Sequence, residues 1–189
     1  MNYDNCIEDL LSHGESQELE FKKSLSLTGE GLKTLCGMIN TDYGRGTVIF
    51  GKNPDGGVDG IEPGNLDTAQ QTLSQKIKTN FDPQIVTDIS VVEYQGKNLL
   101  KISATRSPSI PYHEYNGRAF IREGTSTRQL TLSEKQSLSK RRDRDQHNGP
   151  WRCNKCGSFV GQLQQWIFTG SNSIKSYSCE CGGEYWPVT

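Results

Sequence analysis

Charged and apolar side chains alternate in the segment between Gly14 and Lys23. Alternation at every second residue is typical of a β-strand, whose successive side chains point to opposite faces. Glu18, Glu20 and Lys22 would share one face, and the apolar residues between them would enter a core. Burying an unpaired charge costs several kcal/mol. The charged face is therefore expected to meet water, a metal ion or a polyanion.

Glu15 is the second acidic residue of interest in this segment. It lies five residues before Glu20, so an unbroken strand would point it to the opposite side. It follows Gly14, however, and a turn there would fold Glu15 back beside Glu20. Glu18 is the alternative partner of Glu20 if Glu15 stays in solvent. A solvated strand face is the simplest explanation of the whole pattern.

Composition limits the classes of protein to consider. The 189 residues suffice for one domain of ordinary size and a small appendage. A net charge of -1 provides no general attraction to nucleic acid, so any such binding requires local basic patches. No apolar run is long enough for a membrane span, and the N-terminus lacks a signal peptide, so we expect a cytoplasmic protein. Six cysteines in a reducing compartment favour metal binding over disulfides.

Hydrophobic periodicity predicts an α+β domain over residues 1–145, with a mixed sheet and flanking helices. Besides the charged strand, strands are expected at 47–51, 58–61, 85–94, 98–104 and 118–122. Helices are expected at 3–12, 31–40, 66–81 and 132–142. A charged linker ending in Gly149-Pro150 separates this domain from a small module at 150–189.

Three groups of residues follow one another in a distinctive order. They are Glu15-Ser16-x-x-Leu19-Glu20-Phe21-Lys22, then Ile39-Asn40-Thr41 with a glycine-bearing turn and Val48-Ile49-Phe50-Gly51, and finally Pro111-Tyr112 followed by Gly117 to Thr127. In order and spacing they resemble the AlbA-type (AlbA_2) domain of the schlafen group. The resemblance implies a nucleic-acid-handling protein, with RNA favoured over DNA.

The best-understood schlafen members are endoribonucleases that cut transfer and ribosomal RNA at a metal-dependent carboxylate site. The resemblance implies that Glu15 and Glu20 hold a catalytic Mg²⁺ or Mn²⁺ ion and that Lys22 neutralises charge on the phosphate. Many bacterial relatives are described only as DNA-binding modules. A non-catalytic DNA- or RNA-binding regulator is therefore the alternative, and a zinc-held protein-interaction module is a third.

The third acid of the family site is where this sequence departs from the pattern. The family position falls nearest to Asn53, and Asp55 lies two residues further on. Asp55 would serve as a metal ligand if the turn is one step longer, with Asp59 as a poorer choice. An aspartate before Gly-Gly is also what a tight turn prefers, so Asp55 has a purely structural explanation as well.

The C-terminal module contains a Cys-x-x-Cys pair and, twenty-two residues later, a Cys-x-Cys pair. Four thiolates at this spacing predict one structural zinc ion, because four cysteines leave no open coordination position. Reduced thiols or a disulfide are the alternatives. A hairpin of residues 159–169 and 173–178 would complete a zinc-ribbon shape. The ligands would be Cys153, Cys156, Cys179 and Cys181.

The remaining cysteines and histidines have simpler explanations. Cys6 and Cys36 lie on expected helices and are predicted to be small core residues. His113 and His147 are isolated, and a surface position is expected for each.

Basic side chains for phosphate contacts occur in two places. The last strand and turn of the first domain contribute one set, and the linker a second, although a charged run is usually only a solvated helix end. The candidates are Arg118, Arg122, Arg128, Lys140, Arg141 and Arg142. Aromatic rings of the C-terminal module are candidates for stacking on unpaired bases. The sequence leaves the oligomeric state open, with a homodimer as one outcome.

Overall fold

The chain divides into two compact units, residues 1–138 and 139–189, and helix α4 (Leu132–His147) crosses the boundary between them. None of the helices in the described part of the chain is long and apolar enough to span a membrane. The computed structural model describes residues 7–107, 110–147, 151–153, 159–160, 177–178 and 184–187.

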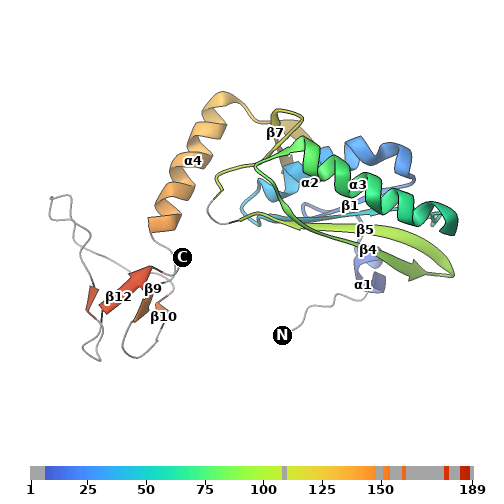
Figure 1. Cartoon of the computed structure of the whole chain (residues 1–189), viewed down its shortest axis with the longest axis horizontal. Helices are drawn as coiled ribbons and strands as arrows, with labels where there is room; N and C mark the ends of the chain where they lie inside the picture. Colours follow the sequence, from blue (N-terminus) through green and yellow to red (C-terminus); the bar gives the residue numbers. More distant parts are fainter. Residues whose placement is uncertain are drawn as a thin grey trace. The chain divides into compact units, whose positions relative to one another are not determined.

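The first unit is built on a four-stranded mixed sheet in the order β1-β2-β5-β4 (Figure 1). Strand β1 runs parallel to β2, and the other neighbours are antiparallel. Strands β4 and β5 form the predicted hairpin, whose turn places Gln95 and Gly96 at positive φ. The four strands are β1 (Leu19–Lys22), β2 (Arg45–Phe50), β4 (Val86–Tyr94) and β5 (Lys97–Thr105).

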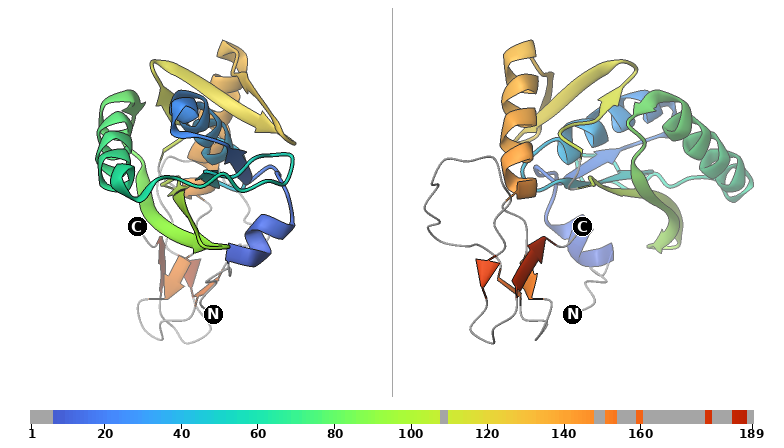
Figure 2. Two further views of the ribbon diagram at one scale, coloured as in Figure 1. Left: turned by 90° about the vertical axis from the view of Figure 1, so that its right-hand side faces the viewer. Right: turned by 60° about the vertical axis from the view of Figure 1, so that its left-hand side comes forward.

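Helices cover both faces of this sheet (Figures 1 and 2). On one face, α2 (Thr28–Ile39) and α3 (Leu66–Asn80) bury Leu35 and Leu73 in the main apolar cluster. On the other face, α1 (Ile7–Ser12) buries Leu11 against β1, β2 and β5. Two short 3₁₀ turns precede the long helices, η1 (Leu25–Leu27) before α2 and η2 (Pro63–Asn65) before α3.

A second four-stranded sheet, in the order β3-β6-β7-β8, packs on the opposite side of α2 (Figure 2). The two elements approach closely at Gly37, where an added Cβ would lie 3.3 Å from the backbone nitrogen of Arg122. Helix α2 is buried on nearly all sides because it lies between the two sheets. The strands are β3 (Phe81–Asp82), β6 (Glu114–Tyr115), β7 (Arg118–Glu123) and β8 (Ser126–Gln129).

The α+β architecture with a mixed sheet and flanking helices confirms the prediction of fold class. Two details differ. Residues 58–61 do not form a strand, because Val58 makes only an isolated bridge with Lys52. Strands β3, β6 and β8 were not predicted, because β3 and β6 have only two residues each and β8 contains no apolar residue that could show a period.

Buried polar groups connect α2 to the second sheet. The Asn40 amide nitrogen donates to the carbonyl oxygens of His113 and Phe120, both at 2.8 Å, and its oxygen accepts from the His113 backbone nitrogen at 2.8 Å. His113 is fully buried, with Nδ1 2.7 Å from the Pro83 carbonyl oxygen. The prediction of a surface position for His113 is therefore wrong. Cys36 is a core residue as predicted, and burial raises the pKa of its thiol to about 12.

The second unit contains short antiparallel strands in the order β10-β9-β12-β11. Cys153 lies in β9, opposite Tyr185 of β12. The other three predicted zinc ligands lie outside the described residues, as does most of the hairpin expected at 159–178. The strands are β9 (Trp151–Cys153), β10 (Phe159–Val160), β11 (Tyr177–Ser178) and β12 (Glu184–Pro187).

Candidate functional site

The carboxylate of Glu20 lies in the interior of the first unit, where both of its oxygens accept from cations. Glu20 is 6% exposed. Its Oε2 lies 2.6 Å from Nη2 of Arg122, and its Oε1 lies 2.5 Å from Nζ of Lys22. On the charged face of β1, Glu20 thus meets Arg122 of β7 and its own neighbour Lys22. Burial is tolerated because the charge is paired and hydrogen-bonded.

Arg122 is 1% exposed, and its guanidinium ties three parts of β1 and the preceding turn together. Nε donates to the Ser16 carbonyl oxygen at 2.9 Å, and Nη2 also approaches the Leu19 carbonyl oxygen at 3.5 Å. The Gln17 side-chain amide donates back to the Arg122 carbonyl oxygen at 3.0 Å. Because β1 is the edge strand of its sheet, these bonds cover its outer edge.

Glu15 folds back onto β1 through the turn at Gly14, whose φ is +72°. Its Oε1 accepts a hydrogen bond from the Phe21 backbone nitrogen at 3.0 Å. This N–H belongs to the outer edge of β1, so Glu15 occupies a position that a neighbouring strand would otherwise fill. Glu15 is therefore near Glu20 along the strand, but in the role of an edge cap.

Replacing Glu15 with glutamine should change the free energy of unfolding by less than about 0.5 kcal/mol, because the amide oxygen still accepts from Phe21. Replacing it with alanine should cost about 1 kcal/mol, the usual value of one hydrogen bond. Urea unfolding followed by far-UV circular dichroism measures both. Equal stabilities for the two variants would contradict a capping role.

Glu18 points to a different partner. Its carboxylate pairs with Nε of Arg45 at the start of β2, in an exposed ion pair. Glu18 and Glu20 therefore do not share a cation, although both were expected on one strand face.

Asp55 lies in an exposed turn and is not drawn into a common cluster with the two glutamates. The turn is closed locally, with the Asp55 backbone nitrogen 3.4 Å from Oδ1 of Asn53. Among the described residues, no group of three or more histidine, cysteine, aspartate or glutamate side chains is placed to hold a metal ion. The donor set of Glu15, Glu20 and Asp55 does not fit a divalent ion in this arrangement, because two cations already take both oxygens of Glu20.

The predicted basic residues fall into different environments. Arg118 and Lys140 are exposed. Arg122 faces the interior. Arg128 lies between Glu123 and Glu134, at 2.5 Å and 2.8 Å, and its guanidinium lowers the pKa of Glu134 to about 2. The side chains of Arg141 and Arg142 lie outside the described part of the chain.

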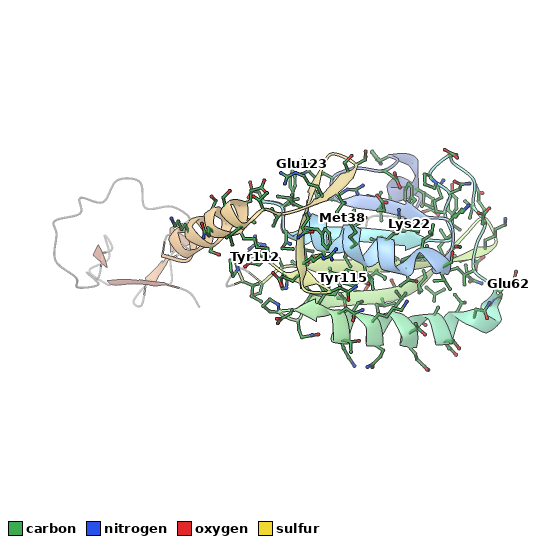
Figure 3. All side chains as sticks on the ribbon, turned by 90° about the horizontal axis from the view of Figure 1, so that it is seen from above. Lys22, Met38, Glu62, Tyr112, Tyr115 and Glu123 are labelled. Atoms are coloured by element: carbon green, nitrogen blue, oxygen red, sulfur yellow. The ribbon has the colours of Figure 1, made fainter. Side chains whose placement is uncertain are left out.

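Figure 3 places Glu123 near the tip of the β7–β8 hairpin. Of two neighbouring residues of β7, Glu123 is therefore exposed at the surface, and the side chain of Arg122 is buried in the core. Sequence reasoning missed this inward turn of Arg122. Alternation along β7 was the available signal, since Phe120 and Arg122 share one face of a strand and Phe120 is a core residue.

Comparison with known proteins identifies one family. The chain matches the family described as Schlafen, AlbA_2 over residues 15–131, which is more than half of its length. No curated protein matches it.

Two examples represent the solved structures that are similar to the chain. The DIP2311 protein from Corynebacterium diphtheriae has a TM-score of 0.51 at 18% identity, with 71% of this chain and 31% of that chain covered. This chain thus spans about a third of that protein, and the likeness concerns the fold. The N-terminal domain of a RecG-related protein from Nitrosomonas europaea has a TM-score of 0.45 at 21% identity, with 66% of this chain and 92% of that chain covered.

Proposed function

The chain belongs to the schlafen AlbA_2 family, and we propose that it binds nucleic acid, RNA in preference to DNA, as a non-catalytic module. Membership over residues 15–131 indicates a nucleic-acid-binding domain. The preference for RNA follows from the schlafen resemblance, because the best-understood schlafen members act on transfer and ribosomal RNA.

One observation carries the non-catalytic reading, namely the pairing of Glu20 with Arg122 and Lys22. A cluster of unpaired carboxylates would repel the phosphates of a nucleic acid unless a metal ion lay between the carboxylates and the phosphates. Here Glu20 is buried and neutralised, and Glu18 is paired with Arg45. The acids around β1 therefore oppose a polyanion much less than their number in the sequence indicates.

Exposed cations are available to meet phosphates. Among the described residues, Lys23, Lys33, Lys76 and Arg118 are exposed, and none of them has a carboxylate partner in the ion pairs of the structure. For binding through phosphate contacts, the logarithm of the binding constant falls linearly with the logarithm of the salt concentration.

A metal-dependent endoribonuclease is the second candidate. It is favoured by the return of Glu15 to β1, which gathers Glu15, Glu20 and Lys22 along one short strand. In such an enzyme Mg²⁺ or Mn²⁺ would supply charge stabilisation at the phosphate. The present partners of Glu20 argue against this candidate.

Fluorescence anisotropy with labelled transfer RNA and a DNA of the same sequence tests binding directly. We expect saturable binding at low salt, tighter for the RNA, and a loss of affinity as salt is raised. The absence of saturable binding would overturn the proposed function.

The same RNA, incubated with Mg²⁺ or Mn²⁺ and resolved on a gel, separates the two candidates. We expect intact RNA. Metal-stimulated cleavage that disappears in Glu15→Gln, a variant expected to keep its stability, would establish the endoribonuclease instead.

A further inference from the structure

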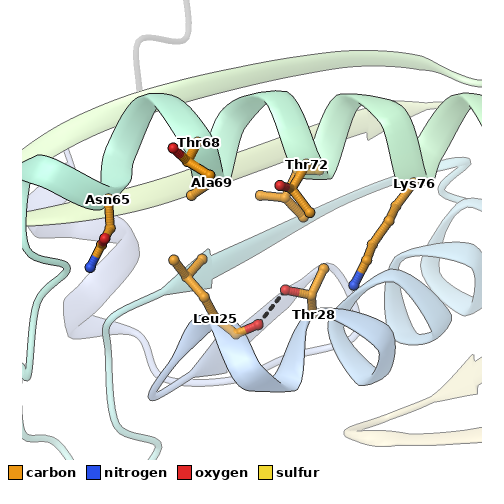
Figure 4. A pocket seen from close by; sticks show the side chains of 8 residues that line it. Leu25, Thr28, Asn65, Thr68, Ala69, Thr72 and Lys76 are labelled. Atoms are coloured by element: carbon orange, nitrogen blue, oxygen red, sulfur yellow. Dashed lines mark hydrogen bonds between the residues drawn. The ribbon is translucent and has the colours of Figure 1, made fainter.

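A hollow of about 230 Å³ lies between α3 and the start of α2 (Figure 4), and neither Glu20 nor Arg122 lines it. One wall is α3, from which Thr68, Ala69, Thr72 and Lys76 face the hollow at the spacing of helical turns. The opposite wall is formed by Leu25 and Thr28, where η1 passes into α2.

The lining combines three kinds of surface. Leu25, Ala69 and Leu73 are apolar, whereas Thr68 and Thr72 carry hydroxyl groups that both donate and accept. Lys76 supplies the single charge, and none of the residues that line the hollow is acidic. Figure 4 shows Lys76 at the end of the hollow opposite Asn65.

Size and chemistry together define the ligand. The hollow is smaller than the roughly 300–1,000 Å³ of sites for drug-sized molecules, so it suits a fragment of the size of one nucleotide. The flat face of a base fits the apolar wall, and its edge fits groups that donate and accept hydrogen bonds. The Lys76 ammonium suits a phosphate at the end of the hollow.

From these features we infer that the hollow binds one unpaired nucleotide of an RNA strand, with the base beside Thr68 and Thr72 and a phosphate at Lys76. This inference rests on the proposed function, and it specifies an unpaired nucleotide as the part of the RNA that the chain recognises. A base in a regular duplex is stacked and paired and cannot enter, whereas a base in a loop can be splayed out. RNA with a single-stranded loop is therefore the preferred partner.

The test uses the full chain and a hairpin RNA with an unpaired loop, compared with a blunt duplex of the same stem. Lys76→Ala should weaken binding to the hairpin and reduce the slope of log K against log salt by about 0.7, the value for one phosphate contact on a single strand. Lys78→Ala is the matched control, because Lys78 is exposed on the same helix and does not line the hollow. It should leave the slope unchanged.

A second pair of variants tests occupancy by the base. Thr72→Phe should fill the hollow and weaken binding of the hairpin about tenfold, within the range for loss of one base contact, while binding of the duplex changes less than about twofold. Gln75→Phe, at an exposed position of α3 outside the hollow, should affect neither RNA.

The outcomes separate the two levels of inference. If the wild-type chain binds the hairpin but both hollow variants behave like their controls, the hollow is not the nucleotide site and the proposed function stands. If the wild-type chain binds neither RNA, the proposed function itself fails.

Discussion

Replacing Arg122 with methionine should lower the free energy of unfolding of the first unit by about 3–5 kcal/mol. The substitution leaves the Glu20 carboxylate buried with only Lys22 as a cationic partner. It also removes the donors to the Ser16 and Leu19 carbonyl oxygens, which hold the outer edge of β1. Urea unfolding followed by far-UV circular dichroism measures the loss.

Two further variants distinguish the ion pair from a general effect of losing an arginine. Arg118→Met, at an exposed position of the same strand, should change the free energy of unfolding by less than about 0.5 kcal/mol. Combining Arg122→Met with Glu20→Leu should recover much of the loss, because a buried pair can often be replaced by apolar residues at little cost. A stable Arg122→Met variant would show that Glu20 reaches solvent or another partner.

The Glu20–Arg122 ion pair shows which contacts of the site could be predicted from local sequence patterns and which could not. The turn before β1 is a local feature, and it indicated that Glu15 could return to the strand, whereas alternation alone would have pointed Glu15 to the opposite side. The buried partner of Glu20, in contrast, is Arg122, which lies 102 positions further along the chain. Only the packing of the second sheet on α2 brings Arg122 there, and a pattern read within one strand carries no information about that packing.

The same limit separates the predicted elements from the missed ones. Helix α3 and the β4–β5 hairpin follow from periodicity over nine to fifteen residues, and each was predicted to within a residue or two at its ends. His113 was assigned to the surface because it is an isolated histidine in the sequence. Its burial depends on Asn40, which hydrogen-bonds to its backbone from the end of α2.

The largest effect is expected in the second unit, where we propose that Cys153, Cys156, Cys179 and Cys181 hold one structural zinc ion. The proposal rests on the spacing of the cysteines, since fewer than about forty residues with few aliphatic side chains seldom fold without such support. Structural zinc contributes about 10–16 kcal/mol of apparent binding free energy at neutral pH. Its removal should therefore unfold the second unit while the first stays folded.

The distribution of tryptophan makes this separation measurable. All three tryptophans of the chain, at positions 151, 166 and 186, belong to the second unit. An excess of chelator should shift their emission towards that of solvent-exposed indole, while the helical signal of α2 and α3 in far-UV circular dichroism persists. Cys179→Ser should give the same emission without chelator, and Cys6→Ser should not.

Elemental analysis should find one zinc per chain in freshly purified, reduced protein. If elemental analysis finds no zinc, or if the tryptophan emission does not change when chelator is added, the four cysteines do not hold a metal ion.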